Sequence, residues 1–198
     1  MYELYITRRS PFARRVRLAL QRLDIKYLEK ETDVFEPAPE FLQRNPLGLI
    51  PVMTLSDGTH LPDSNTILEY LDDAHPGQIW PTDSAAERVL VRQASTWATG
   101  VMTASVALFL EKKRKAADSE WLEEHSSVIL ETLAALDKSA TLRADRMTQA
   151  SWDLGVALEY LDLRTPELPW RKDFYRLESI LLACRKHSAF IKTSPGSA

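Results

Sequence analysis

Strand-forming and helix-forming segments alternate over the first 75 residues, and every strong pattern after them is helical. Residues 2–6 combine aromatic and β-branched side chains, as short strands do. Ser10 followed by Pro11 indicates a helix start, because serine is a good N-cap and proline loses no needed N–H at the first helical position. Apolar side chains at helical spacing then predict a helix to about residue 23.

The following segments complete the order β-α-β-α-β-β-α. They are a strand over 25–28, a short helix over 37–44, two strands over 50–55 and 59–61 around an Asp-Gly turn, and a helix that begins at Asp63–Ser64. Only a mixed sheet with helices packed on its faces accommodates this order in so short a segment. We therefore expect an α/β domain over residues 1–75.

The rest of the chain predicts a helical bundle. A connector rich in helix breakers, residues 76–83, precedes four predicted helices over 84–114, 119–141, 148–164 and 171–187. The longest of them carries an apolar stripe from Leu90 to Leu108, and a polar tail follows from Thr193. We therefore expect a second, all-α domain over residues 84–198.

Composition excludes several classes of function. A net charge of −3 argues against nucleic acid or an anionic membrane as the main partner. The single cysteine, Cys184, rules out an intrachain disulfide framework, and the four histidines lack paired metal-ligand spacing. No apolar run reaches the roughly 20 residues of a membrane helix. Because the N-terminus also lacks signal-peptide features, we expect a cytoplasmic protein without a metal site.

Ser10 lies where thioredoxin-type proteins place a redox-active cysteine, between a strand and a helix. Ala13 lies where the second cysteine of such a pair would be, so this chain cannot perform dithiol exchange itself. The positive end of a helix stabilises a thiolate, and a serine hydroxyl there can donate a hydrogen bond to a sulfur anion from another molecule. The alternative is that Ser10 serves only as an N-cap.

Two later segments allow the same pair of interpretations. Pro51 begins a predicted strand, where proline is unusual because it has no N–H to donate to the sheet. It is either an ordinary trans proline or a cis proline that exposes the backbone of Ile50 to a bound peptide. Asp63 and Ser64 begin a helix, where they act either as a cap or as a site for an ammonium and a carboxylate. A ligand with an α-amino acid at one end and a central thiol fits the second set of interpretations.

With these elements in order, the chain resembles the cytosolic glutathione transferase family over nearly its whole length, and its Ser-Pro-Phe-x-x-Arg-Val-Arg run resembles the Ser-type, tau-like and bacterial classes. The segments that carry the resemblance are Ser10–Arg17, Asn45–Val52, Leu61–Leu71 and Val156–Asp162. The resemblance implies a thioredoxin-like N-terminal domain, a helical C-terminal domain and glutathione as co-substrate. It also implies a homodimer that acts on a small hydrophobic electrophile.

The family's functional residues can be assigned to this chain by the matching motifs. Ser10 would activate the glutathione thiol, Ile50 beside a cis-Pro51 would pair with the cysteinyl part, and Asp63 and Ser64 would hold the γ-glutamyl end. The electrophile would lie between the first domain and the long helix, near Phe12, Trp97, Val101 and Met102.

Two features leave alternatives open. Leu49 stands where many members have a lysine that reaches the glycyl carboxylate, which favours a non-catalytic interaction or regulatory protein. A specialised glutathione-dependent isomerase, dehalogenase or peroxidase is a further alternative. Six arginines within the first 22 residues are interpreted as a solvated helix face or as an attraction for anionic glutathione, in preference to a nucleic-acid patch.

Overall fold

The structure is a computed structural model that describes residues 1–81 and 84–195. Two of the residues predicted to form the connector therefore lie outside the described part of the chain, as do the last three residues of the predicted tail. The chain forms two compact units: Met1–Ile79 together with the segment from Ser188 onward, and Trp80–His187. No helix in the described residues is long and apolar enough to cross a membrane.

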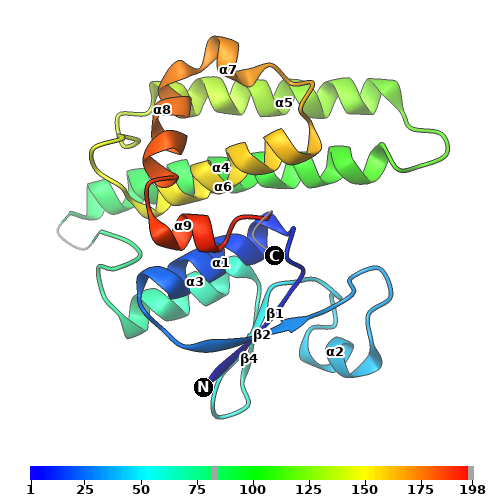
Figure 1. The fold of residues 1–198 in the computed structure, drawn as a ribbon, viewed down its shortest axis with the longest axis vertical. Coiled ribbons are helices and arrows are strands. Elements are labelled where there is room, and N and C mark those ends of the chain that lie inside the picture. Colours follow the sequence, from blue (N-terminus) through cyan, green and yellow to red (C-terminus); the bar gives the residue numbers. More distant parts are fainter. Residues whose placement is uncertain (82–83, 196–198) are drawn as a thin grey trace. The chain divides into compact units, whose positions relative to one another are not determined.

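A four-stranded mixed sheet organises the N-terminal unit (Figure 1). Its strands are β1 (Tyr2–Ile6), β2 (Tyr27–Glu31), β3 (Val52–Thr54) and β4 (His60–Pro62). The spatial order is β2-β1-β3-β4, with β2 parallel to β1, and with β3 antiparallel to both β1 and β4. This confirms the predicted thioredoxin-like arrangement of a mixed sheet covered by helices.

Side chains alternate between the two faces of the sheet along β1, so both faces carry apolar side chains. Helices cover both faces. Leu4 and Ile6 are fully buried on one face, whereas the Tyr5 ring lies on the other, with its centroid 5.8 Å from that of Phe41. Phe41 belongs to α2 (Pro39–Arg44), and α1 (Pro11–Arg22) packs against α3 (Ser64–Ala74) on the opposite side (Figure 1). The predicted starts of α1 and α3 agree with the structure.

The second strand begins two residues later than predicted, at Tyr27 instead of Ile25. The N–H of Ile25 donates to the carbonyl of Leu20, so this residue closes the end of α1. Asp24 before it has a φ of 53°, which reverses the chain direction at this point. Parallel pairing with β1 then defines the strand over Tyr27–Glu31.

A short C-terminal helix, α9 (Ser188–Lys192), packs on α1 within the same unit. The Arg14 guanidinium donates to the carbonyl of Phe190 (3.2 Å) and stacks on its ring. Arg17 donates to the carbonyl of Thr193 (3.3 Å) and pairs with Glu29 (2.7 Å). The prediction of a polar tail from residue 193 is therefore wrong at Thr193, which is buried, and α9 was not predicted.

Helices form the second unit, as predicted for the all-α part of the chain. They are α4 (Ala85–Glu111), α5 (Ser119–Lys138), α6 (Gln149–Arg164), α7 (Trp170–Asp173) and α8 (Tyr175–Cys184). The fourth predicted helix, over 171–187, is divided, because the backbone leaves the helical region at Phe174 (φ −127°, ψ 55°). The predicted apolar stripe of α4 is wrong at Leu90, which is 50% exposed, whereas the neighbouring Val91 is buried.

Candidate functional site

Strand pairing brings the three predicted site segments to one end of the N-terminal sheet. In the two antiparallel pairings of β3, the C-terminal ends of β1 and β4 meet its N-terminal end. Ser10 follows β1 by a short loop, Ile50 and Pro51 immediately precede β3, and Asp63 and Ser64 immediately follow β4. Ser10 thus meets residues that lie 40 to 54 positions later in the sequence at one end of the sheet.

Ser10 is the N-cap of α1, with its backbone extended (φ −71°, ψ 125°) and its side chain partly buried. Its Oγ accepts a hydrogen bond from the N–H of Ala13 at 3.2 Å, so the capping interpretation holds. A serine hydroxyl has two lone pairs and one hydrogen, and this bond uses only a lone pair. The hydroxyl hydrogen can therefore donate to an anion at the positive end of α1.

Asp63 caps α3 in a similar way. Its Oδ1 accepts hydrogen bonds from the N–H groups of Asn65 (2.7 Å) and Thr66 (3.2 Å). The side chain of Asp63 is exposed. Ser64, the first residue of the helix, is buried. A carboxylate and a hydroxyl are thus held side by side at the N-terminus of an 11-residue helix.

The loop before β3 is held by the side chain of Asn45, whose amide donates to the carbonyl of Leu49 (2.7 Å). Gly48 in this loop has a φ of 67°, a conformation that favours glycine. The peptide bond between Ile50 and Pro51 is cis, as the family resemblance implies. The side chain of Leu49 is 61% exposed.

Arg15 is a buried residue of this region that the sequence interpretation missed. It is 1% exposed and donates to Ser64 Oγ (3.1 Å) and Asn65 Oδ1 (2.7 Å). The solvated-face interpretation of the early arginines is wrong for Arg15, and equally wrong for Arg14 and Arg17, which are also buried. A signal was present in the sequence, because the spacing of Arg15 from Phe12 and Ala19 places it on the apolar face of α1.

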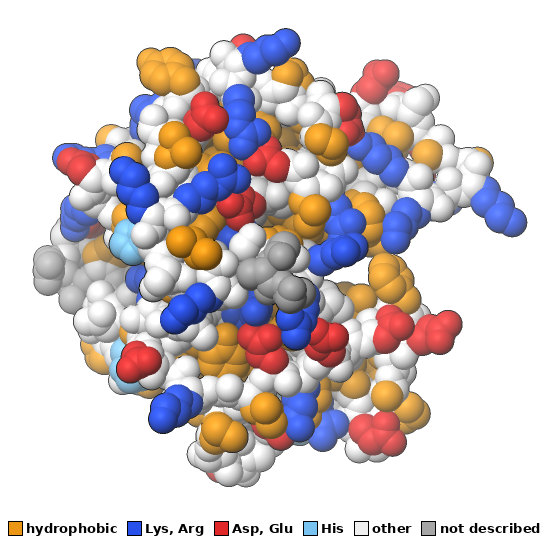
Figure 2. All heavy atoms as spheres, in the orientation of Figure 1, with side chains coloured by type: hydrophobic (Ala, Val, Ile, Leu, Met, Phe, Trp, Pro, Cys, Tyr) orange, Lys and Arg blue, Asp and Glu red, His pale blue; other side chains and the backbone are white. Residues whose placement is uncertain are grey.

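On the face shown in Figure 2, lysine and arginine side chains are interspersed with aspartate and glutamate. This distribution differs from the continuous basic stripe of a nucleic-acid-binding surface. Within residues 1–81 and 84–195, no cluster of three or more His, Cys, Asp or Glu residues is arranged to hold a metal ion.

The four residues predicted to contact an electrophile differ in their accessibility. Val101 and Met102 are at most 1% exposed and belong to the core around α4, so they offer no surface to a ligand in this structure. Phe12 and Trp97 are partly exposed, and they stay predicted contacts.

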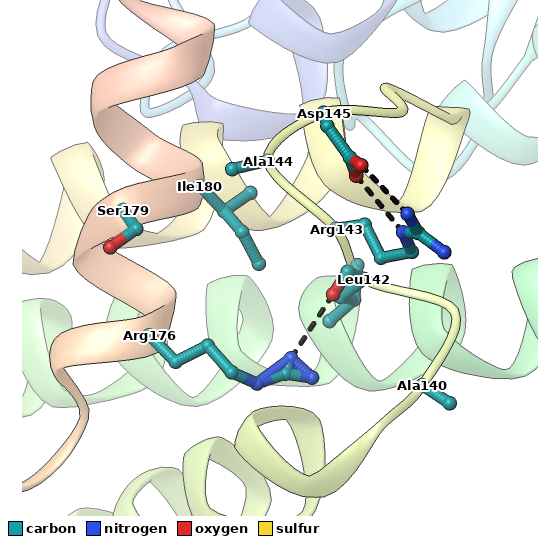
Figure 3. Close-up of a pocket in the computed structure, with 8 residues that line it drawn as sticks. All are labelled: Ala140, Leu142, Arg143, Ala144, Asp145, Arg176, Ser179 and Ile180. Atoms are coloured by element: carbon teal, nitrogen blue, oxygen red, sulfur yellow. Dashed lines mark hydrogen bonds and ion pairs between the residues drawn. The ribbon is translucent and has the colours of Figure 1, made fainter.

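The helical unit contains a cavity of about 400 Å³ (Figure 3). Its lining residues are Ala140, Leu142, Arg143, Ala144, Asp145, Arg176, Ser179 and Ile180. Arg176 donates to backbone carbonyls, among them those of Asp137 (2.8 Å) and Leu142 (3.0 Å), and Arg143 pairs with Asp145 (2.7 Å). The cavity includes none of the predicted site residues, and the bonds of its two arginines secure the turn between α5 and α6.

Comparison with known proteins identifies related chains. The family described as glutathione S-transferase, N-terminal domain, matches residues 4–78. The "Uncharacterized GST-like protein YibF" of Escherichia coli is 25% identical, with 96% of each chain covered. Glutathione S-transferase omega-1 of Sus scrofa is 26% identical over 97% of this chain and 74% of its own length.

Solved structures agree over the full length. A glutathione S-transferase from Methylobacillus flagellatus, crystallised with GSH bound, has a TM-score of 0.89 and 29% identity, with 98% of this chain and 100% of that chain covered. A glutathione transferase family member from Pseudomonas fluorescens with bound glutathione has a TM-score of 0.88 and 29% identity, with 98% and 99% covered. Together with the sheet topology and the residues at one end of the sheet, these matches show that residues 4–78 form a glutathione S-transferase N-terminal domain and that the whole chain has the fold of glutathione transferases.

Proposed function

We propose that this protein is a glutathione transferase that binds glutathione at the end of its N-terminal sheet where Ser10 lies, and activates the thiol for attack on a small hydrophobic electrophile. The observation that supports this most directly is the convergence of Ser10, Ile50 and Asp63–Ser64 at one end of the sheet. Relatives with the same fold, crystallised with glutathione, support the choice of ligand.

Ser10 would lower the pKa of the glutathione thiol. The thiolate is the nucleophile, and its fraction at neutral pH rises as the thiol pKa falls. A decrease of about two pKa units corresponds to about 2.7 kcal/mol. One hydrogen bond to a charged group contributes about 1.5–3 kcal/mol, so the Ser10 hydroxyl, with the N-terminus of α1, supplies an effect of the required size.

The two ends of glutathione would be held by polar groups on either side of the thiol. The backbone of Ile50 would pair with the cysteinyl residue as an added strand does. Asp63 would bind the γ-glutamyl ammonium, because both of its capping bonds use Oδ1 and Oδ2 takes part in neither. Ser64 would donate to the neighbouring carboxylate. The resemblance further implies a homodimer in the cytoplasm.

Calorimetric titration with glutathione, followed by turnover of an activated aryl halide, tests this proposal. We expect saturable binding and conjugation. Absence of binding at millimolar glutathione contradicts the proposal.

A non-catalytic regulatory protein is the second candidate, favoured by the exposed Leu49 at the position where many relatives carry a lysine. Such a protein retains the fold but fails to conjugate the aryl halide, even where it binds glutathione. Conjugation that is lost in Ser10→Ala excludes this candidate.

A further inference from the structure

A buried arginine links α1 to the N-terminus of α3. Arg15 lies in the second turn of α1, is 1% exposed, and places Nη1 at 3.1 Å from Ser64 Oγ and 2.7 Å from Asn65 Oδ1. Both acceptors belong to the first two residues of α3. Arg15 therefore contacts the same helix end that the proposed function assigns to the γ-glutamyl group.

These two bonds determine which groups the helix end presents to a ligand. A guanidinium donates hydrogen bonds and accepts none, so the atoms that face it must be acceptors. The Ser64 hydroxyl accepts from Arg15 through a lone pair, which leaves its hydrogen to donate in another direction. The side-chain oxygen of Asn65 faces Arg15, so the amide NH₂ group points away from it, on an exposed residue.

The neighbouring Asp63 supplies the opposite kind of group. Its carboxylate is held by the N–H groups of Asn65 and Thr66. Hydrogen-bond donors from Ser64 and Asn65 and a negative charge from Asp63 thus lie together at one helix end. This is the complement of an α-amino acid zwitterion, in which a carboxylate and an ammonium are attached to one carbon.

We infer that Arg15 is a positioning residue for the γ-glutamyl α-carboxylate of glutathione, acting through Ser64 and Asn65 without touching the ligand. The inference rests on the proposed function and adds to it a residue that determines recognition of this carboxylate. Replacing Arg15 by an apolar residue frees the Ser64 hydroxyl and the Asn65 amide to rotate. The donors are then no longer directed toward the carboxylate.

Arg14 provides a matched control on the same helix. It is equally buried, at 1% exposed, but it donates to the carbonyl of Phe190 in α9 and stacks on the Phe190 ring. Arg14→Met and Arg15→Met therefore remove the same group at neighbouring positions of equal burial. Arg15→Met removes the hydrogen bonds to Ser64 and Asn65, whereas Arg14→Met removes the hydrogen bond to Phe190.

The experiment is calorimetric titration of the parent and both variants with two ligands. One ligand is glutathione, and the other is γ-aminobutyryl-cysteinyl-glycine, which lacks only the γ-glutamyl α-carboxylate. We expect Arg15→Met to weaken glutathione binding about 10- to 100-fold and to change binding of the analogue little. In turnover assays, KM for glutathione rises while kcat is kept. Arg14→Met is expected to lower the melting temperature and to leave the affinity for both ligands unchanged.

Each other outcome contradicts a specific statement. If the parent binds glutathione and Arg15→Met binds it equally well, or loses affinity for both ligands alike, the role of Arg15 is wrong and the proposed function stands. If the parent does not bind glutathione, the proposed function fails, and the role of Arg15 fails with it. If Arg15→Met does not fold, Arg15→Lys takes its place; it keeps the charge but offers a single nitrogen, and we expect a loss of about three- to tenfold confined to glutathione.

Discussion

Replacing Ser10 by alanine separates the capping role of this residue from its proposed catalytic role. The capping bond, from the N–H of Ala13 to Ser10 Oγ at 3.2 Å, is lost in the variant. Loss of a serine N-cap costs about 1 kcal/mol of stability, which corresponds to a fall in melting temperature of roughly 2–4 °C for a chain of this size. Loss of a hydrogen bond to the thiolate removes about 1.5–3 kcal/mol, which raises the thiol pKa of bound glutathione by about one to two units.

The rate of conjugation reports the second effect. A higher thiol pKa moves the pH–rate curve to higher pH, so the rate at neutral pH falls about 10- to 100-fold. At alkaline pH, above the ordinary cysteine pKa of about 8.5, the thiol ionises without assistance and the two rates approach each other. Glutathione affinity, measured by titration, is expected to change far less than the rate.

Ser84 offers a matched control, because it caps α4 through the same kind of bond, from the N–H of Glu87 to Ser84 Oγ at 3.2 Å. Ser84→Ala is expected to cost a similar amount of stability and to leave the conjugation rate unchanged. Equal neutral-pH rates for Ser10→Ala and the parent would refute the role of Ser10. A loss of rate that persists unchanged at alkaline pH would also refute it, because the residue would then act on something other than thiol ionisation.

Two further substitutions and one deletion test the stability of the fold and the binding of glutathione. A hydrogen bond from the Asp118 N–H holds the pKa of Glu111 below its ordinary value of 4.5. The bond therefore stabilises the fold above pH 4.5, and this stabilisation is lost as the pH falls through the lowered pKa. In urea unfolding, Glu111→Gln should be less stable than the parent at neutral pH, and the difference should shrink in acid. Deletion of residues 188–198 removes the Phe190 partner of Arg14 and should lower the melting temperature by several degrees; an unchanged melting temperature would show that α9 contributes nothing to the N-terminal unit. Leu49→Lys should tighten glutathione binding about three- to tenfold through the glycyl carboxylate and lose this gain in high salt, whereas a salt-independent change would contradict the electrostatic explanation.

Features that depend on a few neighbouring residues were predictable from the sequence. The starts of α1 at Ser10–Pro11 and of α3 at Asp63–Ser64 agree with the structure, because an N-cap bonds to N–H groups only two or three residues away. The Asp-Gly turn between β3 and β4 has the same local origin. The order of strands and helices followed from these signals.

Features that depend on distant partners were not predictable in this way. Arg14 and Arg15 have the composition of a solvated helix face, yet both are buried, because α9 and α3 supply acceptors for their guanidinium groups. In α4, Leu90 is exposed and Leu108 is buried, although both belong to the predicted apolar stripe. Periodicity indicates that a helix has an apolar side, whereas the neighbouring helices determine which residues that side includes.

The candidate site combines both kinds of information. Local chemistry makes Ser10 and Asp63 helix caps, and each cap leaves an atom that can interact with a ligand. Their proximity depends on the antiparallel pairing of β3 with two other strands, a register that no short segment of sequence contains. The orientation of Ser64 likewise depends on Arg15, which lies 49 residues away in the chain and comes into contact only when α1 packs on α3.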